Sequence, residues 1–378
     1  MKTWPEYTVA CRKDVDTLLK KGGSLSAYRA SSAFPDWKGP AKDSWAWRLE
    51  REIERKFKVK HAVCVNSGTA ALHAAVSAIN LRKGDEVITT PYTFSATVSA
   101  IILGGGVPRF ADIDPYSFCI TKETVKHAIT RRTKAILPVH LFGQITPGLS
   151  DLCELGIPVV EDACQSVGAR VGSKYSGTIG ISGAYSYNGG KQQPAGEGGA
   201  LVTNSSQVAE EARLLMNHRE NFPHQKQVGY NYRINEVTAC IAWHGLMELE
   251  ERNRKRQELA LVFGREVIAH HGLKCVDPPD AFVRPESHVF YTFPLLFHNH
   301  HHIPRSLFIS RMKRKGYAVQ AGYTQPLHTL PAFRKYQRGP LPVVEDVHKR
   351  LCLLNNVRPP STEKQMREMA IAMREALE

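Results

Sequence analysis

The stretch Ala62-Val-Cys-Val-Asn66-Ser-Gly-Thr-Ala-Ala71 joins a short apolar run to a series of strong helix formers. Residues 62–66 are typical of a buried strand, and residues 69–80 (TAALHAAVSAIN) are typical of a helix. A helix that begins directly after a strand points free backbone N–H groups and the positive end of its dipole at an anion. Gly68 permits close approach, and the hydroxyls beside it add donors. The junction predicts a phosphate site or, as the alternative, a plain turn with a hydroxyl cap.

The same alternation of β-branched runs and helical patterns continues over the first two-thirds of the chain. Further strands are expected at residues 86–90, 107–113, 135–140 and 158–161, with a helix at 94–103. Strands separated by helices at this spacing predict βαβ units and a mainly parallel sheet covered by helices, an α/β fold. Residues 183–187 and 199–203 are expected to form two more strands, joined by the loop that holds Lys191.

A long helical segment, residues 235–268, ends this first pattern. After it come short strands (288–297), a helix (304–315), a Pro- and His-rich stretch and a terminal amphipathic helix (362–377). The change predicts a large domain of residues 1–255 and a smaller C-terminal α/β domain of residues 256–378. Residues 1–30 are expected to cover the mouth of a site or to pack on a partner subunit. Adjacent histidines in the run 298–302 cannot all face one metal, so a surface loop is expected there and no metal site.

Composition and charge narrow the class of protein. The chain has 378 residues, and 42% of them are hydrophobic. It has no signal-peptide pattern and no apolar run of the roughly 20 residues that span a bilayer. The eight cysteines include no CxxC pair, which is typical of reduced thiols in a cytoplasmic protein. The formal charge of +14 is spread along the chain without a nucleic-acid-binding motif. Neither nucleic acid nor a membrane is therefore expected as a partner, and the charge suits a phosphorylated small molecule.

Two further features could carry chemistry. Glu161-Asp162 follows a strand, and a carboxylate at the C-terminal edge of a parallel sheet lies where α/β proteins place ligands. A helix N-cap is the competing interpretation. Lys191 lies in the glycine-rich loop Ser186-Tyr-Asn-Gly-Gly-Lys191, where packing gives a lysine little reason to be. Its amine could form an imine, although most loop lysines are merely solvated.

The order of the three features is typical of fold-type I enzymes that use pyridoxal 5′-phosphate (PLP): a phosphate cradle at a helix start, a carboxylate at a strand end, and a lysine 29 residues later. From about residue 24 to its end, the chain resembles the DegT/DnrJ/StrS-type sugar aminotransferases. The matching blocks are Asn66-Ser-Gly-Thr-Ala-Ala-Leu72, Gly84-Asp-Glu-Val-Ile88, Pro91-Tyr-Thr-Phe94, Phe110-Ala-Asp-Ile-Asp114, Val139-His-Leu-Phe-Gly143, Glu161-Asp-Ala-Cys-Gln165, Gly196-Glu-Gly-Gly199, Gly229-Tyr-Asn-Tyr-Arg233 and Pro326-Leu-His328.

The resemblance implies roles for individual residues. Lys191 would hold PLP covalently and then carry a proton between Cα of the substrate and C4′ of the cofactor. Asp162 would pair with the pyridinium nitrogen, which keeps the ring an electron sink. The other implied cofactor contacts are Ser67, Gly68, Thr69 and Ala70 at the helix start, Phe94 on the exposed ring face, Gln165 near O3′ and Ser186 on the phosphate.

The resemblance also implies an assembly. Asn231 is expected to reach the phosphate of the neighbouring subunit's cofactor, so the functional unit would be a homodimer with shared active sites. His328, Tyr323 and Arg233 are expected near the substrate. The residues around the lysine (Gly189, Gly190, Gln192, Gln193 and Pro194) differ from the commoner sequence of the family at this loop.

The implied reaction is a two-step transamination. Glutamate first gives its amino group to the cofactor, and the ketone of a sugar then receives that amino group. The expected sugar is linked to a nucleotide. Three alternatives stay open. The same fold could act on a carbocyclic ketone of the inosose type or form an aromatic amine by elimination. It could be a PLP-dependent dehydratase, although relatives with that chemistry carry histidine in place of the lysine. It could also be a non-catalytic regulatory relative.

Overall fold

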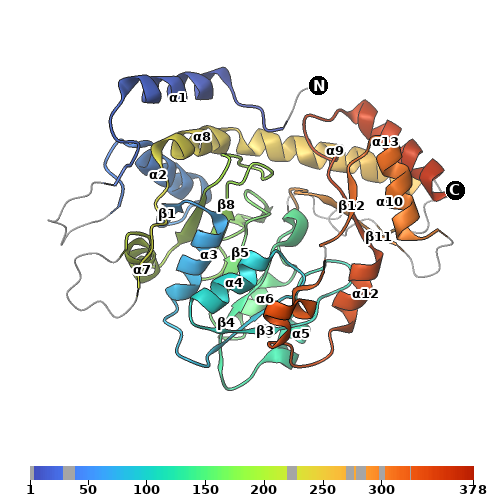
Figure 1. The fold of residues 1–378 in the computed structure, drawn as a ribbon, viewed down its shortest axis with the longest axis horizontal. Helices are drawn as coiled ribbons and strands as arrows, with labels where there is room; N and C mark the ends of the chain where they lie inside the picture. Colours follow the sequence, from blue (N-terminus) through green and yellow to red (C-terminus); the bar gives the residue numbers. More distant parts are fainter. Residues whose placement is uncertain are drawn as a thin grey trace.

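The computed structural model describes residues 4–28, 39–218, 228–269, 276–277, 287–297, 303–323 and 325–378. The histidine run 298–302, with the surface loop expected there, lies outside these ranges. Figure 1 shows a large region built around one sheet and, beside it, the C-terminal strands and helices. Helices α8 and α9 run end to end across the upper part of this view, below α1, and join the two regions.

Two strand groups lie edge to edge in the large region, a four-stranded one in the order β1-β9-β8-β5 and a three-stranded one in the order β3-β2-β4. Parallel bridges from Ile136 to Val159 and from Val139 to Asp162 connect β4 to β5, so the two groups form one sheet. Only the pairings of β9 are antiparallel, which confirms the predicted mainly parallel sheet. The strands are β1 (His61–Val65), β2 (Glu86–Thr89), β3 (Val107–Phe110), β4 (Thr133–Leu137), β5 (Val160–Asp162), β8 (Ser182–Ser186) and β9 (Gly199–Thr203).

Helices cover both faces of this sheet. The Tyr185 ring lies 5.2 Å from the Phe57 ring of α2, whereas its neighbour Ser186 lies against Gly68 at the start of α3. Successive residues of a strand face opposite sides, so α2 and α3 cover opposite faces. The helices of this region are α1 (Val9–Lys21), α2 (Trp45–Phe57), α3 (Gly68–Ser77), α4 (Ser95–Leu103), α5 (Lys122–Ala128), α6 (Leu149–Cys153), α7 (Ser206–Met216) and α8 (Glu236–Met247), with a 3-10 turn at Leu141–Gly143 and a hairpin of β6 (Arg170–Val171) and β7 (Lys174–Tyr175).

The C-terminal region contains a second sheet, antiparallel throughout, in the order β10-β11-β13-β12. An apolar cluster that includes Phe263 of α9, Phe293 of β11 and Met369 of α13 packs against it. The elements are α9 (Leu249–Ala269), β10 (Val276–Asp277), β11 (Phe293–Phe297), α10 (Arg305–Arg314), β12 (Val319–Ala321), a 3-10 turn (Leu327–Thr329), α11 (Pro331–Arg334), α12 (Pro342–Arg350), β13 (Leu351–Leu354) and α13 (Glu363–Leu377).

Helix α12 ties the C-terminal region back to the large sheet. Asp112, which follows β3, accepts hydrogen bonds from the first-turn N–H groups of Val343 (3.0 Å) and Val344 (2.9 Å). Side chains of α12 then join Phe110 in one apolar cluster. A carboxylate at a helix N-terminus satisfies donors that lack a partner within the helix. The two regions therefore share both an apolar contact and a capped helix.

The predicted helix 235–268 differs from the structure at one residue. α8 ends at Met247, Glu248 adopts φ −92° and ψ −3°, and α9 begins at Leu249. The strong helix formers on both sides carry no signal for this break, because a one-residue interruption leaves the composition of the segment unchanged. In the part of the chain that is described, no helix is long and apolar enough to cross a membrane.

Gly183 in β8 supports a prediction about packing. A Cβ atom at this position would lie 2.3 Å from both Cα and the carbonyl oxygen of Gly177, which are backbone atoms that cannot turn aside. We expect Gly183→Ala to lower the free energy of unfolding by about 1–3 kcal/mol, the usual cost of overpacking a buried site. Urea denaturation followed by tryptophan fluorescence measures the change. Gly339→Ala is the matched control, because no atom lies within 4 Å of a Cβ there. Equal denaturation midpoints for the two variants would contradict this account of the packing.

Candidate active site

A cavity of about 570 Å³ lies where the start of α3, the end of β5, the loop between β8 and β9 and the second sheet meet. It brings together residues that are far apart in the sequence. Nine of the predicted site residues line it: Ser67, Gly68, Thr69, Phe94, Asp162, Gln165, Ser186, Lys191 and Tyr323. The second sheet and the segments beside it add Tyr291, Thr292, Gln320, Asn355 and Arg358.

The helix start of α3 forms one wall. Ser67 is the N-cap of α3, and its Oγ accepts a hydrogen bond from the backbone N–H of Ala70 (3.0 Å). Gly68 lets this turn approach β8, since a Cβ on Gly68 would lie 2.8 Å from Cβ of Ser186 and 3.1 Å from Sγ of Cys164. The same turn therefore contains the Ser67 hydroxyl cap and a helix N-terminus that faces the cavity, and both lie beside the Ser186 hydroxyl. The N–H of Ala70 is already used by the cap.

The end of β5 supplies the carboxylate. Asp162 is 5% exposed, and its Oδ2 accepts a hydrogen bond from the Thr97 hydroxyl of α4 (2.7 Å). Its Oδ1 accepts the backbone N–H of Cys164 (3.2 Å), while the Thr93 and Thr97 hydroxyls lie 3.0 Å apart. These contacts fix the direction of the Asp162 carboxylate at the cavity wall. Burial and the nearby Asp162 charge raise the pKa of the Cys164 thiol well above its usual value, so Cys164 lies there as a neutral thiol.

Glu161, the preceding residue, faces the opposite side of the sheet. Its Oε2 accepts hydrogen bonds from His140 Nε2 (2.8 Å) and Gly177 N–H (2.7 Å), and its Oε1 accepts those of Ile179 and Gly180 N–H (both 2.6 Å). Both Glu161 and His140 are fully buried. Four donors on one carboxylate make Glu161 a structural anchor at the base of the site.

The loop between β8 and β9 presents the lysine. Lys191 Nζ lies 4.2 Å from the centre of the Tyr291 ring, a cation–π contact. The backbone N–H of Lys191 donates to the carbonyl of Asn188 (2.9 Å), and Arg358 Nη1 donates to the carbonyl of Gly190 (3.2 Å). The amine is thus held at the cavity between a turn of its own loop and the second sheet.

Tyr323 and Gln165 form the wall opposite the helix start. Gln165 Oε1 accepts the backbone N–H of Phe142 (2.9 Å), and its Nε2 donates to the Tyr323 hydroxyl (2.8 Å). Desolvation raises the pKa of Tyr323 above its usual value despite this hydrogen bond, so the neutral phenol keeps a proton that it can donate. Phe94, the N-cap of α4, is 63% exposed at the rim, an unusual position for a large apolar ring.

Four predicted residues do not line this cavity: Ala70, whose N–H is used by the α3 cap, and Asn231, Arg233 and His328. Asn231 is exposed, and its carbonyl accepts a hydrogen bond from Asn66 Nδ2 (3.2 Å). Arg233 donates to Asn217 Oδ1 (2.7 Å). His328 is 1% exposed, and its Nε2 lies 3.5 Å from Glu345 Oε1. Their predicted contacts with cofactor or substrate stay predictions.

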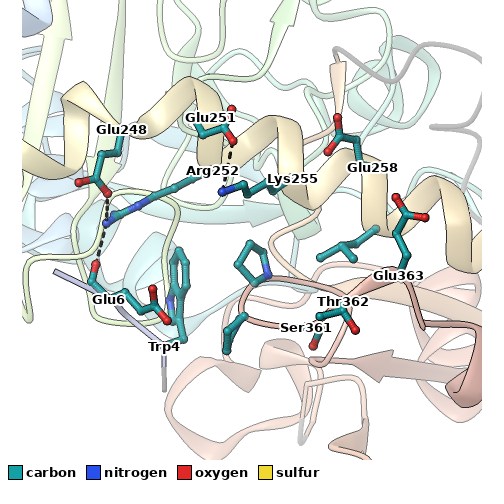
Figure 2. Close-up of a pocket in the computed structure, with 13 residues that line it drawn as sticks. Trp4, Glu6, Glu248, Glu251, Arg252, Lys255, Glu258, Ser361, Thr362 and Glu363 are labelled. Atoms are coloured by element: carbon teal, nitrogen blue, oxygen red, sulfur yellow. Dashed lines mark hydrogen bonds and ion pairs between the residues drawn. The ribbon is translucent and has the colours of Figure 1, made fainter. Parts of the chain in front are cut away.

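A second cavity of about 570 Å³ lies along α9, next to the start of α13 (Figure 2). Its basic groups are paired, since Arg252 Nη2 lies 2.6 Å from Glu248 and Lys255 Nζ lies 3.2 Å from Glu251. Figure 2 shows Arg252 reaching from Glu248 to the backbone of Glu6, so these side chains hold the N-terminal segment on the helix. With paired cations, this cavity lacks the free amine and directed carboxylate of the first one.

The anchor at Glu161 leads to a prediction. We expect Glu161→Gln to lower the free energy of unfolding by about 2–4 kcal/mol, because an amide leaves buried donors without an acceptor. Differential scanning fluorimetry and chemical denaturation measure the loss. Glu123→Gln is the control, since Glu123 is exposed on α5 and such substitutions cost less than about 0.5 kcal/mol. If the two variants were equally stable, the anchoring role of Glu161 would be wrong.

Comparison with known proteins identifies the family of this chain. The DegT/DnrJ/EryC1/StrS aminotransferase family model matches residues 43–373. The chain is 33% identical over 309 residues to a pleiotropic regulatory protein of Geobacillus stearothermophilus, covering 80% of this chain and 81% of that one. It is 32% identical over 309 residues to GDP-perosamine synthase of Caulobacter vibrioides, covering 78% and 81%.

Among solved structures, the chain is similar to NtdA of Bacillus subtilis with bound cofactor PMP. The TM-score is 0.80 at 25% identity, and the match covers 98% of this chain and 83% of that one. Fold and sequence thus lead to the same assignment. The chain belongs to the DegT/DnrJ/EryC1/StrS family of PLP-dependent aminotransferases.

Proposed function

We propose that this chain transfers an amino group from glutamate to the ketone of a nucleotide-linked sugar, with PLP held at Lys191. One observation carries the proposal: Lys191, the Asp162 carboxylate and the start of α3 line a single cavity. A free amine, a directed carboxylate and an anion-binding helix start are the three groups that PLP requires. The relative named GDP-perosamine synthase and the formal charge of +14 support an anionic, nucleotide-linked substrate.

The residues present fit the cofactor. Gly68 brings the start of α3 close to Ser186, so Ser67, Thr69 and the Ser186 hydroxyl lie on one side of the cavity, where they would hold a phosphate. Asp162 would meet the pyridine nitrogen, and the exposed Phe94 ring would cover one face of the cofactor. When bound, PLP supplies an electron sink that allows an amino group to be exchanged for a ketone.

Each residue of the cavity has a separate role in the proposed reaction. Asp162, oriented by the Thr97 hydroxyl, would hold a proton on the pyridine nitrogen. Lys191 Nζ, once free of the cofactor, would take the proton from Cα of the donor and return it at C4′ of the cofactor. Gln165 and the neutral Tyr323 phenol, joined by a 2.8 Å hydrogen bond, orient the ring oxygen side and donate to the substrate.

The alternatives differ in substrate rather than in site. A carbocyclic ketone would use the same groups, and a panel of keto-sugars and inososes separates the two. Lysine at position 191 disfavours the dehydratases, which carry histidine there. One relative is named a regulatory protein, but the lysine and carboxylate retained in this cavity favour catalysis. We propose a cytoplasmic enzyme, in keeping with its small-molecule substrates.

Lys191 provides the direct test. We expect borohydride reduction of the PLP-loaded protein to fix the cofactor on Lys191, and mass spectrometry of the digested protein to locate it there. Lys191→Ala should lose turnover by about 10⁴-fold or more, because no other amine of the cavity can move the proton. Lys174→Ala, an exposed lysine of the β6–β7 hairpin, is the control. Retained transaminase activity in Lys191→Ala would falsify the role of this lysine.

Asn231 tests the assembly that we propose, a homodimer in which each subunit completes its neighbour's site. Its exposed position outside the cavity of its own chain supports this arrangement. We expect Asn231→Ala and Lys191→Ala to be weakly active or inactive alone. Mixed dimers should regain up to about one quarter of the activity, because half of the dimers are mixed and each holds one intact site. No recovery after subunit exchange, verified by mass spectrometry of the intact dimers, would contradict shared sites.

A further inference from the structure

Arg358 is a cation of the cavity that none of the assigned roles uses. It follows β13, lines the cavity and donates from Nη1 to the carbonyl oxygen of Gly190 (3.2 Å). Gly190 directly precedes Lys191, so the half-buried guanidinium lies beside the lysine loop. This carbonyl contact uses one of the five N–H donors of an arginine.

The charge of Arg358 is not neutralised within the described part of the chain. No described carboxylate forms an ion pair with it, and the cavity carboxylates Asp162 and Glu197 hydrogen-bond to other groups, Glu197 to Asn188 (3.0 Å). A second buried cation, Arg256, lies behind the cavity lining, 0% exposed and donating to the carbonyl of Phe290 (3.1 Å). Desolvation, with the Arg358 charge next, lowers the pKa of Arg256 to about 9. Desolvation also lowers the pKa of Arg358. Partly desolvated cations without a counter-charge are costly, and an anionic ligand relieves that cost.

The surroundings decide which anion fits. Tyr291 lies near both Arg358 and the lysine. Its ring centre is 4.2 Å from Lys191 Nζ, and its hydroxyl is 3.8 Å from the position that a Cβ on Gly190 would take. Gly190 is also the residue whose carbonyl accepts the hydrogen bond from Arg358. The Arg358 guanidinium and the Lys191 amine therefore lie on the same side of the cavity. In an α-amino acid, amine and carboxylate are bonded to one carbon. The diphosphate of a nucleotide sugar, by contrast, is separated from the ring ketone by several bonds.

We propose that Arg358 binds the α-carboxylate of the amino donor and so selects amino acids over simple amines as donors. This inference rests on the proposed function, since it names the donor subsite of the same cavity. The planar fork of a guanidinium matches a carboxylate with two parallel hydrogen bonds. Bound in this way, the donor places its amine and its Cα–H next to Lys191.

The test compares Arg358→Gln with the unaltered protein, using L-glutamate and its α-amide L-isoglutamine as donors. Loss of a charge-assisted contact lowers kcat/KM for glutamate roughly 10- to 100-fold, with the larger share in KM. Isoglutamine, which has no α-carboxylate, reacts slowly with the unaltered protein and nearly as well with the variant. The half-reaction with the keto substrate, started from protein loaded with the amine form of the cofactor, keeps its rate.

A binding measurement provides a readout independent of turnover. 2-Methyl-L-glutamate carries the same carboxylates but has no Cα hydrogen, so it binds without being transaminated. Its dissociation constant, measured by calorimetry, rises by a similar factor in Arg358→Gln and by less in Arg358→Lys, which keeps the charge but loses the fork. Arg367→Gln is the matched control, because Arg367 is exposed on α13 and pairs with Glu266 (3.1 Å). Melting temperatures confirm that each variant is folded.

Three outcomes overturn the inference. Unchanged glutamate kinetics and 2-methylglutamate binding in Arg358→Gln show that the arginine does not hold the donor. A loss confined to the keto-substrate half-reaction assigns Arg358 to the nucleotide diphosphate instead. If the unaltered, PLP-loaded protein reacts with no amino acid, the proposed function itself fails and the donor subsite fails with it. That last outcome differs from the first two, in which the unaltered protein does react.

Discussion

The end of strand β5 is the point on which the rest of the site depends. Glu161 accepts four hydrogen bonds on one face of the sheet, and these bonds fix His140 and the turn that leads into β8. Because alternate residues of a strand face opposite sides, this anchor commits Asp162 to the other face, toward the cavity. A shift of one residue in register would exchange the two carboxylates. The fourfold hydrogen bonding of Glu161 disfavours that shift, and so the sheet itself positions the carboxylate that the chemistry requires.

The cavity is complete only when the second sheet lies beside the first. The large sheet contributes a helix start, a carboxylate and the lysine loop, all at strand ends, as expected for an α/β fold. The C-terminal region adds Tyr291 under the lysine, Tyr323 against Gln165 and Arg358 beside Gly190. Asp112 holds this region in place by capping α12. Packing between the two regions is thus coupled to the geometry of the site.

Local signals explain which parts could be predicted from sequence. The strands of the large sheet, the cap at Ser67 and the positions of Lys191 and Asp162 at strand ends follow from short local motifs. The chemical roles of Lys191 and Asp162 came from the resemblance to the family and stay predictions. The break at Glu248 carries no such signal. Tyr291 and Arg358 also escaped prediction, because they reach the lysine only through the long-range pairing of β11 with β13. Glu161 and Asp162 were adjacent candidates, and only the direction of each side chain distinguishes the anchor from the cavity group. The roles of Asn231 and His328 stay predictions.

The most direct measurement is the absorbance spectrum of the purified protein loaded with PLP, recorded before and after addition of L-glutamate. The account predicts a visible band from lysine-bound cofactor, which decays on addition of glutamate while the shorter-wavelength band of the amine form rises. These changes would establish the cofactor, the reactive amine and the donor half-reaction together. A protein that takes up no PLP, or whose visible band does not respond to any amino acid, would contradict the account.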